Sequence, residues 1–157
     1  MSVQHALATV LANNAELSAC LPSGCAVQAT WTPAVAVETL TAPTLLIVPN
    51  GFEVEWAARR MDRMTCRISF VMATPGDSHN DIETTVEAAE AIVAWLKGQL
   101  SMDGTPPRVI SDGVWRVAEV ERMEHDLLVR EQRIAIVTVP TTWECDHTYY
   151  TAGPPIP

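Results

Sequence analysis

The side chains of this chain that could take part in catalysis are four histidines and a group of carboxylates. The histidines His5, His79, His125 and His147 are scattered along the sequence. A nucleophilic site needs a Ser or Cys within reach of a base, often in a recognisable turn motif. No such motif accompanies any of the four, so we expect these histidines on the surface or at helix ends.

The carboxylates gather around one of the histidines. Glu119, Glu121, Glu124 and Asp126 surround His125, and such a group could hold a metal or supply an acid–base pair. Three arginines are interleaved with them, and mixed charges of this kind favour a solvated ion-pair face: Arg116, Arg122 and Arg130. A small hydrolase or transferase that uses His125 and the neighbouring carboxylates remains a second hypothesis.

The four cysteines do not have the spacing of a metal site. They are Cys20, Cys25, Cys66 and Cys145, whereas zinc sites use closely paired ligands such as C-x2-C. Cys20 and Cys25 enclose a turn-forming Leu-Pro-Ser-Gly that could bring their sulfurs together, but free thiols are the default in a reducing compartment. Because a glycine-rich phosphate loop is also missing, we expect no metal, no cofactor and no catalytic residue.

Composition and charge exclude further classes. Of 157 residues 48% are apolar and 18% charged, which is typical of one folded domain. The net charge is −9, and Lys97 is the single lysine, whereas stable binding of nucleic acid needs clustered Lys and Arg. No apolar run approaches the roughly 20 residues of a membrane span, and the N-terminus lacks the pattern of a secretory signal. We therefore expect a product that stays in the cytoplasm or leaves inside a larger assembly.

Helical periodicity predicts two helices that would position these side chains. The first has Ser2 as its cap and runs to about Asn13. The second follows Ser78, which with Asp81 resembles a capping box, and its apolar residues keep to one side as far as Leu100. This long amphipathic helix is expected to pack flat on one face of a sheet.

Alternation and proline boundaries predict the strands of that sheet. Ala26–Trp31 and the apolar run Thr44–Val48 are predicted strands, and Pro49-Asn50-Gly51 is a predicted turn. In 53–60, Val54 and Trp56 alternate with Glu53 and Glu55. A turn at 61–64 then leads to a return strand with these inner residues: Cys66, Ile68, Phe70 and Met72, with Arg67 and Ser69 outside. Further strands are predicted at 109–111, 114–120 and 131–139.

These elements together predict an α+β fold, a mixed and mainly antiparallel sheet packed against a long amphipathic helix and an N-terminal helix. Residues 1–144 are expected to form this single domain. Residues 145–157 are expected to form an extended arm, because its terminal prolines exclude ladder pairing. Tyr149, Tyr150 and Ile156 give the arm apolar side chains for contact with a neighbouring subunit or partner.

The middle of the chain carries a family resemblance. Residues 31–40 have the pattern W-x-P-x3-V-E-x-L, and an apolar strand ending in Val48-Pro49 follows. Arg59-Arg60, a return strand, the long acidic helix and a β-branched final strand come next. Over roughly Ala26 to Trp143, this order resembles the tail terminator (tail completion) proteins of the neck of long-tailed bacteriophages. The resemblance implies a mixed sheet with flanking helices and a hexameric ring on the tail tube, below the head-to-tail connector.

The resemblance also implies a role and partners. The chain would be a virion structural protein, not an enzyme, that ends tail polymerisation and joins the tail to the head. Its partners would be further copies of itself, the tail tube protein and the connector or head-closure protein. Another neck or head-closure adaptor with a different ring size remains an alternative.

Charged residues are the candidate sites within such a ring. Six copies would carry about −54 charges, and an acidic channel would let DNA pass without specific binding. The candidates for its lining are Glu53, Glu55, Glu119, Glu121, Glu124 and Asp126. Arg59 and Arg60 are candidates for ion pairs to an adjacent subunit, with a solvated strand end as the equal alternative.

Overall fold

The computed structural model describes residues 2–32, 40–58, 61–76, 78–99, 115–129 and 133–148. These residues contain the helices α1 (Val3–Ala12), α2 (Ala15–Ala19) and α3 (His79–Gln99). They also contain the strands β1 (Ala26–Ala29), β2 (Thr44–Ala58), β3 (Met61–Pro75), β4 (Trp115–Val120), β5 (Glu124–Val129) and β6 (Ile134–Thr148). The strands form one sheet in the order β1-β2-β3-β6-β4, and β5 also pairs with β6. The β1–β2 pair is parallel and the others are antiparallel, so the predicted α+β fold with a mixed, mainly antiparallel sheet is confirmed.

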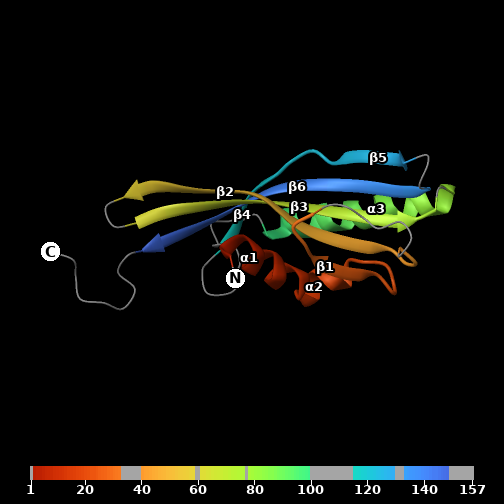
Figure 1. Ribbon diagram of the computed structural model, residues 1–157, viewed down its shortest axis with the longest axis horizontal. Helices are drawn as coiled ribbons and strands as arrows, with labels where there is room; N and C mark the ends of the chain where they lie inside the picture. Colours follow the sequence, from red (N-terminus) through yellow and green to blue (C-terminus); the bar gives the residue numbers. More distant parts are fainter. Residues whose placement is uncertain are drawn as a thin grey trace.

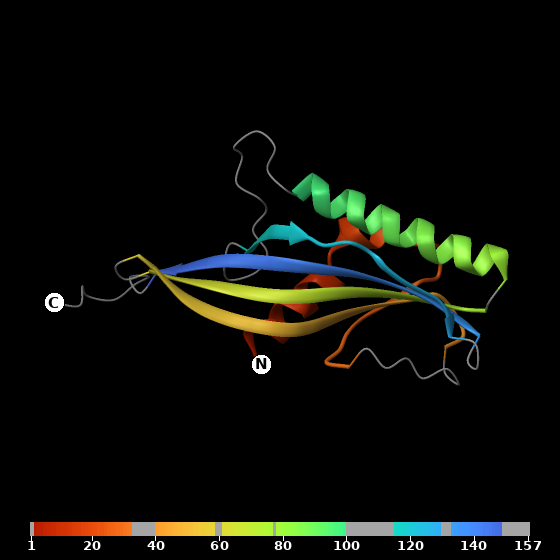
Figure 2. The same cartoon turned by 90° about the horizontal axis from the view of Figure 1, so that it is seen from above.

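Three long strands give the molecule its length. β2, β3 and β6 have 15 residues each, which corresponds to about 50 Å of extended chain. They run side by side along the whole molecule in Figures 1 and 2. On the outer side of β6, β5 pairs with its first part and β4 with its last part. In Figure 1 the ends of β2, β3 and β6 project to the left beyond the helices.

The main hydrophobic core lies between the sheet and the helices. The predicted inner residues of β3 are confirmed, since Cys66, Ile68, Phe70 and Met72 are each at most 1% exposed. α1 packs Leu7 and Leu11 into the same cluster, and α3 packs residues that include Ile92 and Leu96. Full burial of such side chains stabilises the fold by about 1.5–3 kcal/mol each. We call this side of the sheet the helix face.

The other side of the sheet, the open face, carries a smaller apolar cluster. Leu46, Val48 and Val71 are buried there, and Ile136 packs against them. Ser69, which was predicted to be outside, lies on this face but is only 8% exposed. Its hydroxyl lies 2.9 Å from the Asn50 amide, which donates to it, so the polar group is satisfied where it is buried.

The helix caps follow their sequence signals. The N–H of His5 donates to the Ser2 hydroxyl at 3.1 Å at the start of α1. At the start of α3, the Asp81 N–H donates to the Ser78 hydroxyl at 3.2 Å, and the Ser78 N–H donates to the Asp81 carboxylate at 3.1 Å. The predicted capping box is therefore confirmed. In the described part of the chain, no helix is both long and apolar enough to cross a membrane.

Two short elements were not predicted. α2 has five residues, and its cap is Asn14, whose side chain accepts from the N–H groups of Glu16 and Leu17. So short a helix has almost no periodicity, and its stability comes from packing. β5 lies in the charged stretch that was interpreted as an ion-pair face. This stretch forms a strand despite its polar composition because it pairs with β6.

The predicted break within β2 is wrong. Pro49, Asn50 and Gly51 are not a turn but part of one continuous strand, with a register shift between Pro49 and Gly51 that leaves Asn50 as an extra residue. Such a bulge bends a strand without ending it. Pro49 is tolerated because its backbone nitrogen points away from β3, so the missing N–H costs no hydrogen bond between β2 and β3.

Two predicted boundaries are also wrong. Met61–Met64 was a predicted turn but belongs to β3, whose Met61 already pairs with Ala58. β6 does not end at residue 139 but continues to Thr148. The arm therefore cannot begin at residue 145, because Cys145 pairs with Met64 and is only 2% exposed. The predicted strand at 109–111 lies outside the described residues.

Candidate assembly interface

The projecting end of the sheet has two chemically different faces. We call residues 51–58 of β2 and 61–67 of β3 the hairpin tip. Cross-strand partners share a face, so Phe52, opposite Cys66, and Val54, opposite Met64, lie on the helix face. Phe52 is 40% exposed and Val54 is 52% exposed. The apolar layer of the core therefore continues into the hairpin tip, where the described residues leave it partly uncovered.

Acidic side chains occupy the open face of the same segment. Glu53 and Glu55 alternate with the apolar residues of β2, as predicted, and both are exposed. The register forms a row across four strands, Glu53–Thr65–Glu144–Arg116, and the next row contains Arg67, Thr142 and Glu119. The two acidic groups singled out in the sequence thus share one face, at opposite edges of the sheet.

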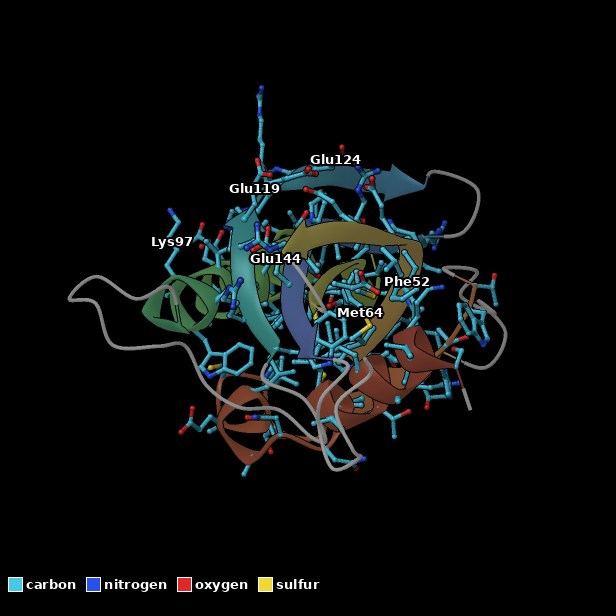
Figure 3. All side chains as sticks on the ribbon, turned by 90° about the vertical axis from the view of Figure 1, so that its left-hand side faces the viewer. Phe52, Met64, Lys97, Glu119, Glu124 and Glu144 are labelled. Carbon is cyan, nitrogen blue, oxygen red and sulfur yellow. The ribbon has the colours of Figure 1, made fainter. Side chains whose placement is uncertain are left out.

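The remaining acidic candidates lie farther along that face or beside it. Glu124 is exposed and pairs with Thr138, which places it on the open face near the other end of β6. Glu121 lies between β4 and β5, and its N–H donates to the Pro140 carbonyl at 2.9 Å. The backbone of Asp126 pairs with Ile136. Figure 3 shows Glu119, Glu124 and Glu144 on one side of the sheet, whereas Phe52 lies on the flank formed by β2.

This face contains an ion pair between Arg116 and Glu144. The Arg116 guanidinium lies 3.5 Å from the Glu144 carboxylate, and both side chains are a little more than a quarter exposed. Exposed pairs of this type contribute about 0–1 kcal/mol. The pair ties β4 to β6 and leaves charge of both signs near the β4 edge.

The described histidines are not assembled for chemistry. His125 is exposed and lines an open recess of about 680 Å³ with Arg122, Met123 and Glu124. His5 stacks on Trp31 with ring centroids 5.8 Å apart, and His79 is exposed at the first turn of α3. Within the described ranges, no three His, Cys, Asp or Glu side chains come together as a metal site. The recess at His125 thus has one base and one carboxylate but no adjacent nucleophile among its described lining residues.

All four cysteines are free thiols. Burial raises the pKa of Cys66 to about 12. Burial also raises the pKa of Cys20, with a further contribution from the Glu16 carboxylate. Burial raises the pKa of Cys25 too, opposed by a backbone hydrogen bond at Leu45. The thiolate is the reactive form, so these environments disfavour nucleophilic or metal-binding cysteines.

Several predicted contact residues lie outside the described ranges. These are Arg59, Arg60, Tyr149, Tyr150 and Ile156. Conversely, the sequence prediction did not single out Phe52, Met64 or Glu144. The signal for Phe52 was present, because the alternation of apolar and acidic residues begins at Phe52 and not at Val54.

Comparisons with known proteins identify a fold and no sequence family. No family model matches the chain, and no curated protein matches it. A solved structure described as "Virion of native gene transfer agent (GTA) particle" contains a similar chain, with a TM-score of 0.54 and 15% sequence identity. The match covers 93% of this chain and 96% of that chain. At this identity the likeness concerns the fold, and that chain is similar to the present one over nearly its full length.

Proposed function

We propose that this protein is a structural component of a tailed phage or phage-like virion, where it forms a ring at the top of the tail tube. The observation that carries the proposal is the fold likeness to a chain of a virion particle, which extends over nearly the whole of both chains. A likeness that complete favours an equivalent building block over a shared catalytic module. The pattern around Trp31 to Val48 adds the narrower assignment to the tail terminators.

The two faces of the hairpin tip support assembly. Exposed apolar side chains at an edge strand mark contact surfaces, and Phe52 and Val54 occupy such a position. A subunit with different edges on its two sides assembles head to tail, and a fixed rotation closes the ring. One end of the ring would match the end of the tail tube and the other would not, so addition of tube subunits would stop there. The free end would receive the connector.

The open face supports passage of DNA through the ring. Glu53, Glu55, Glu119 and Glu124 all lie on this face. A negatively charged channel wall repels the phosphate backbone of DNA and does not bind it. In this arrangement the helices face outward and the open face lines the bore.

An assembly experiment tests the proposal. The purified chain is added to polymerising tail tube subunits from the same virion, and tube length and tube ends are recorded by negative-stain electron microscopy. We expect a ring at one end of each tube and shorter tubes as the chain is increased. Phe52→Glu should lose both effects, whereas Ala94→Glu, which introduces the same carboxylate at an exposed position of α3, should retain them.

Other outcomes separate the alternatives. A ring that binds the connector but leaves tube length unchanged would favour another neck or head-closure adaptor. A monomer that binds neither partner would contradict the virion role and return attention to the recess at His125.

A further inference from the structure

We propose that neighbouring copies of this chain join edge to edge, with the outer edge of β2 in the hairpin tip pairing with the outer edge of β4 of the next copy. This inference rests on the proposed ring and names the residues that would hold it together. It combines three observations: the backbone groups at the β2 edge, the order of strand directions, and the side chains at the two edges.

The outer edge of β2 is paired for only part of its length. β1 pairs with β2 from Thr44 to Ile47, and the Thr30 N–H donates to the Ile47 carbonyl at 3.1 Å. Among the strands in the described ranges, none pairs with this edge beyond Ile47. Residues 51–58 therefore present a long edge to which no described strand pairs, and natural sheets rarely leave such an edge open.

The register shows which backbone groups point outward. Ile47 pairs with Phe70 and directs its carbonyl toward β1, away from β3. Every second residue of β3 directs its backbone groups the same way as Phe70. These residues and their β2 partners are Ile68 with Pro49, Cys66 with Phe52, and Met64 with Val54. The N–H and C=O groups of Phe52 and Val54 therefore point to the outer edge. Pro49, which has no N–H to donate, fits the same orientation.

The strand directions allow a second copy to continue the sheet. β2, β3, β6 and β4 are neighbours in this order and alternate in direction. β4 is thus antiparallel to β2, and β4 of one copy placed beside β2 of the next copy extends the alternation without interruption. Such a contact uses two different edges of the same chain and is heterologous, as a closed ring requires.

The side chains at the two edges match on both faces. On the helix face, the rows that end in Phe52 and Val54 at the β2 edge end in Val117 and Trp115 at the β4 edge. On the open face, the row that ends in Glu53 at one edge ends in Arg116 at the other. Val117 and Trp115 are themselves only 3% and 5% exposed, so Phe52 and Val54 would extend this buried apolar layer at its rim. The Glu53 carboxylate would join Arg116, which already pairs with Glu144 within its own copy. Figure 3 shows Phe52 on one flank of the sheet and Glu119 with Lys97 on the opposite flank.

Charge reversal and rescue test the pairing. Glu53→Arg combined with Glu55→Arg, and separately Arg116→Glu, should each raise the concentration for half-assembly at least about tenfold, measured by light scattering after gel filtration. All three changes together should recover most of the assembly. Glu83→Arg combined with Glu90→Arg, an equal charge change on exposed positions of α3, is the matched control and should leave assembly unchanged.

A backbone variant tests the same edge without charge. Val54→Pro removes an outward N–H and should weaken assembly about tenfold or more, while Glu53→Pro removes a group directed at β3 and should instead lower the melting temperature of the monomer. Reversals that leave assembly intact, or losses that the triple change does not rescue, would overturn the edge pairing. A wild-type chain that stays monomeric would overturn it too. A ring that obeys these predictions but does not cap tail tubes would overturn the proposed function alone.

Discussion

The indole N–H of Trp143 donates to the Thr141 hydroxyl at 3.0 Å within the core, and that hydroxyl donates in turn to the Ile68 carbonyl at 2.7 Å. Thr141 is 2% exposed and Trp143 is 1% exposed. This pair allows a large aromatic side chain to be buried between β6 and the helices with its polar group satisfied.

Thr141→Val should therefore lower the free energy of unfolding by about 1–3 kcal/mol, because it keeps the shape of the side chain but leaves the indole N–H without a partner. Thr142→Val, on the half-buried open face of the same strand, is the control and should change stability by less than about 0.5 kcal/mol. Urea denaturation measures both. Equal effects would show that the Trp143 hydrogen bond contributes nothing specific.

Alkaline pH should destabilise the fold through Cys66. Its pKa is raised to about 12 in the folded protein, whereas an unfolded cysteine titrates near pH 8.5–9. Between about pH 9 and pH 12 the unfolded state loses the proton and the folded state keeps it, so stability falls as pH rises. Cys66→Ala removes this ionisable group. Within that window the free energy of unfolding of the variant should therefore fall less steeply with pH, by about 1.4 kcal/mol per pH unit, which corresponds to one proton. Identical slopes for wild type and variant would refute the assignment.

The C-terminal arm should begin after Thr148. Deletion of 149–157 is expected to change monomer stability by less than about 0.5 kcal/mol but to weaken assembly, because the arm offers Tyr149, Tyr150 and Ile156 as contacts. Deletion of 145–157 is the contrasting variant, and it should destabilise the monomer since it removes the buried Cys145. Thermal unfolding and gel filtration distinguish the two. A large loss of stability on the shorter deletion would place the arm in the core.

Charge reversal at Glu119 and Glu124 should give the open face an affinity for DNA. Glu119→Lys combined with Glu124→Lys is expected to leave the ring assembled and to create DNA binding that falls steeply with salt. Glu83→Lys combined with Glu90→Lys, on α3, adds the same charge outside the proposed bore. If the α3 variant binds DNA equally well, or the open-face variant does not bind it, the acidic lining is wrong.

Arg59 and Arg60 remain candidates for ion pairs to an adjacent subunit. Arg59→Ala and Arg60→Ala are each tested for assembly, with Arg67→Ala, an exposed arginine of β3, as the reference. A desolvated interface pair costs about 2–5 kcal/mol when it is truncated, whereas an exposed pair contributes about 0–1 kcal/mol. We expect at least one of the two variants to lose assembly, and unchanged assembly in both would mean a solvated strand end.

The sequence predicted those features of the fold that depend on local periodicity. The inner face of β3, the cap at Ser2 and the Ser78–Asp81 box each follow from residues within a few positions of one another. The failures were non-local. The end of β6 depends on its partners in β3 and β4, and β5 exists because β6 offers it an edge. Composition alone could not reveal either pairing.

The candidate site shows the same division. Alternation predicted that Glu53 and Glu55 lie on the other face of their strand from Val54. It could not show that Glu119 and Glu124 share the face of Glu53 and Glu55, since β3 and β6 lie between them. The exposed position of Phe52 was hidden by the interpretation of Pro49-Asn50-Gly51 as a turn, which separated Phe52 from the strand it belongs to.

The extra residue at Asn50 reverses which residues of β2, odd-numbered or even-numbered, face the helices. Before it, odd-numbered residues such as Leu45 and Ile47 face the helices, and after it even-numbered residues such as Phe52 do so. Loss of Asn50 would close the bulge and leave Phe52 opposite Cys66, so the hairpin tip would keep its orientation. Loss of a single residue a few positions later would turn the rest of the tip over, carrying Glu55 to the apolar side. Variation in the length of this strand can therefore be absorbed at Asn50 and at few other positions.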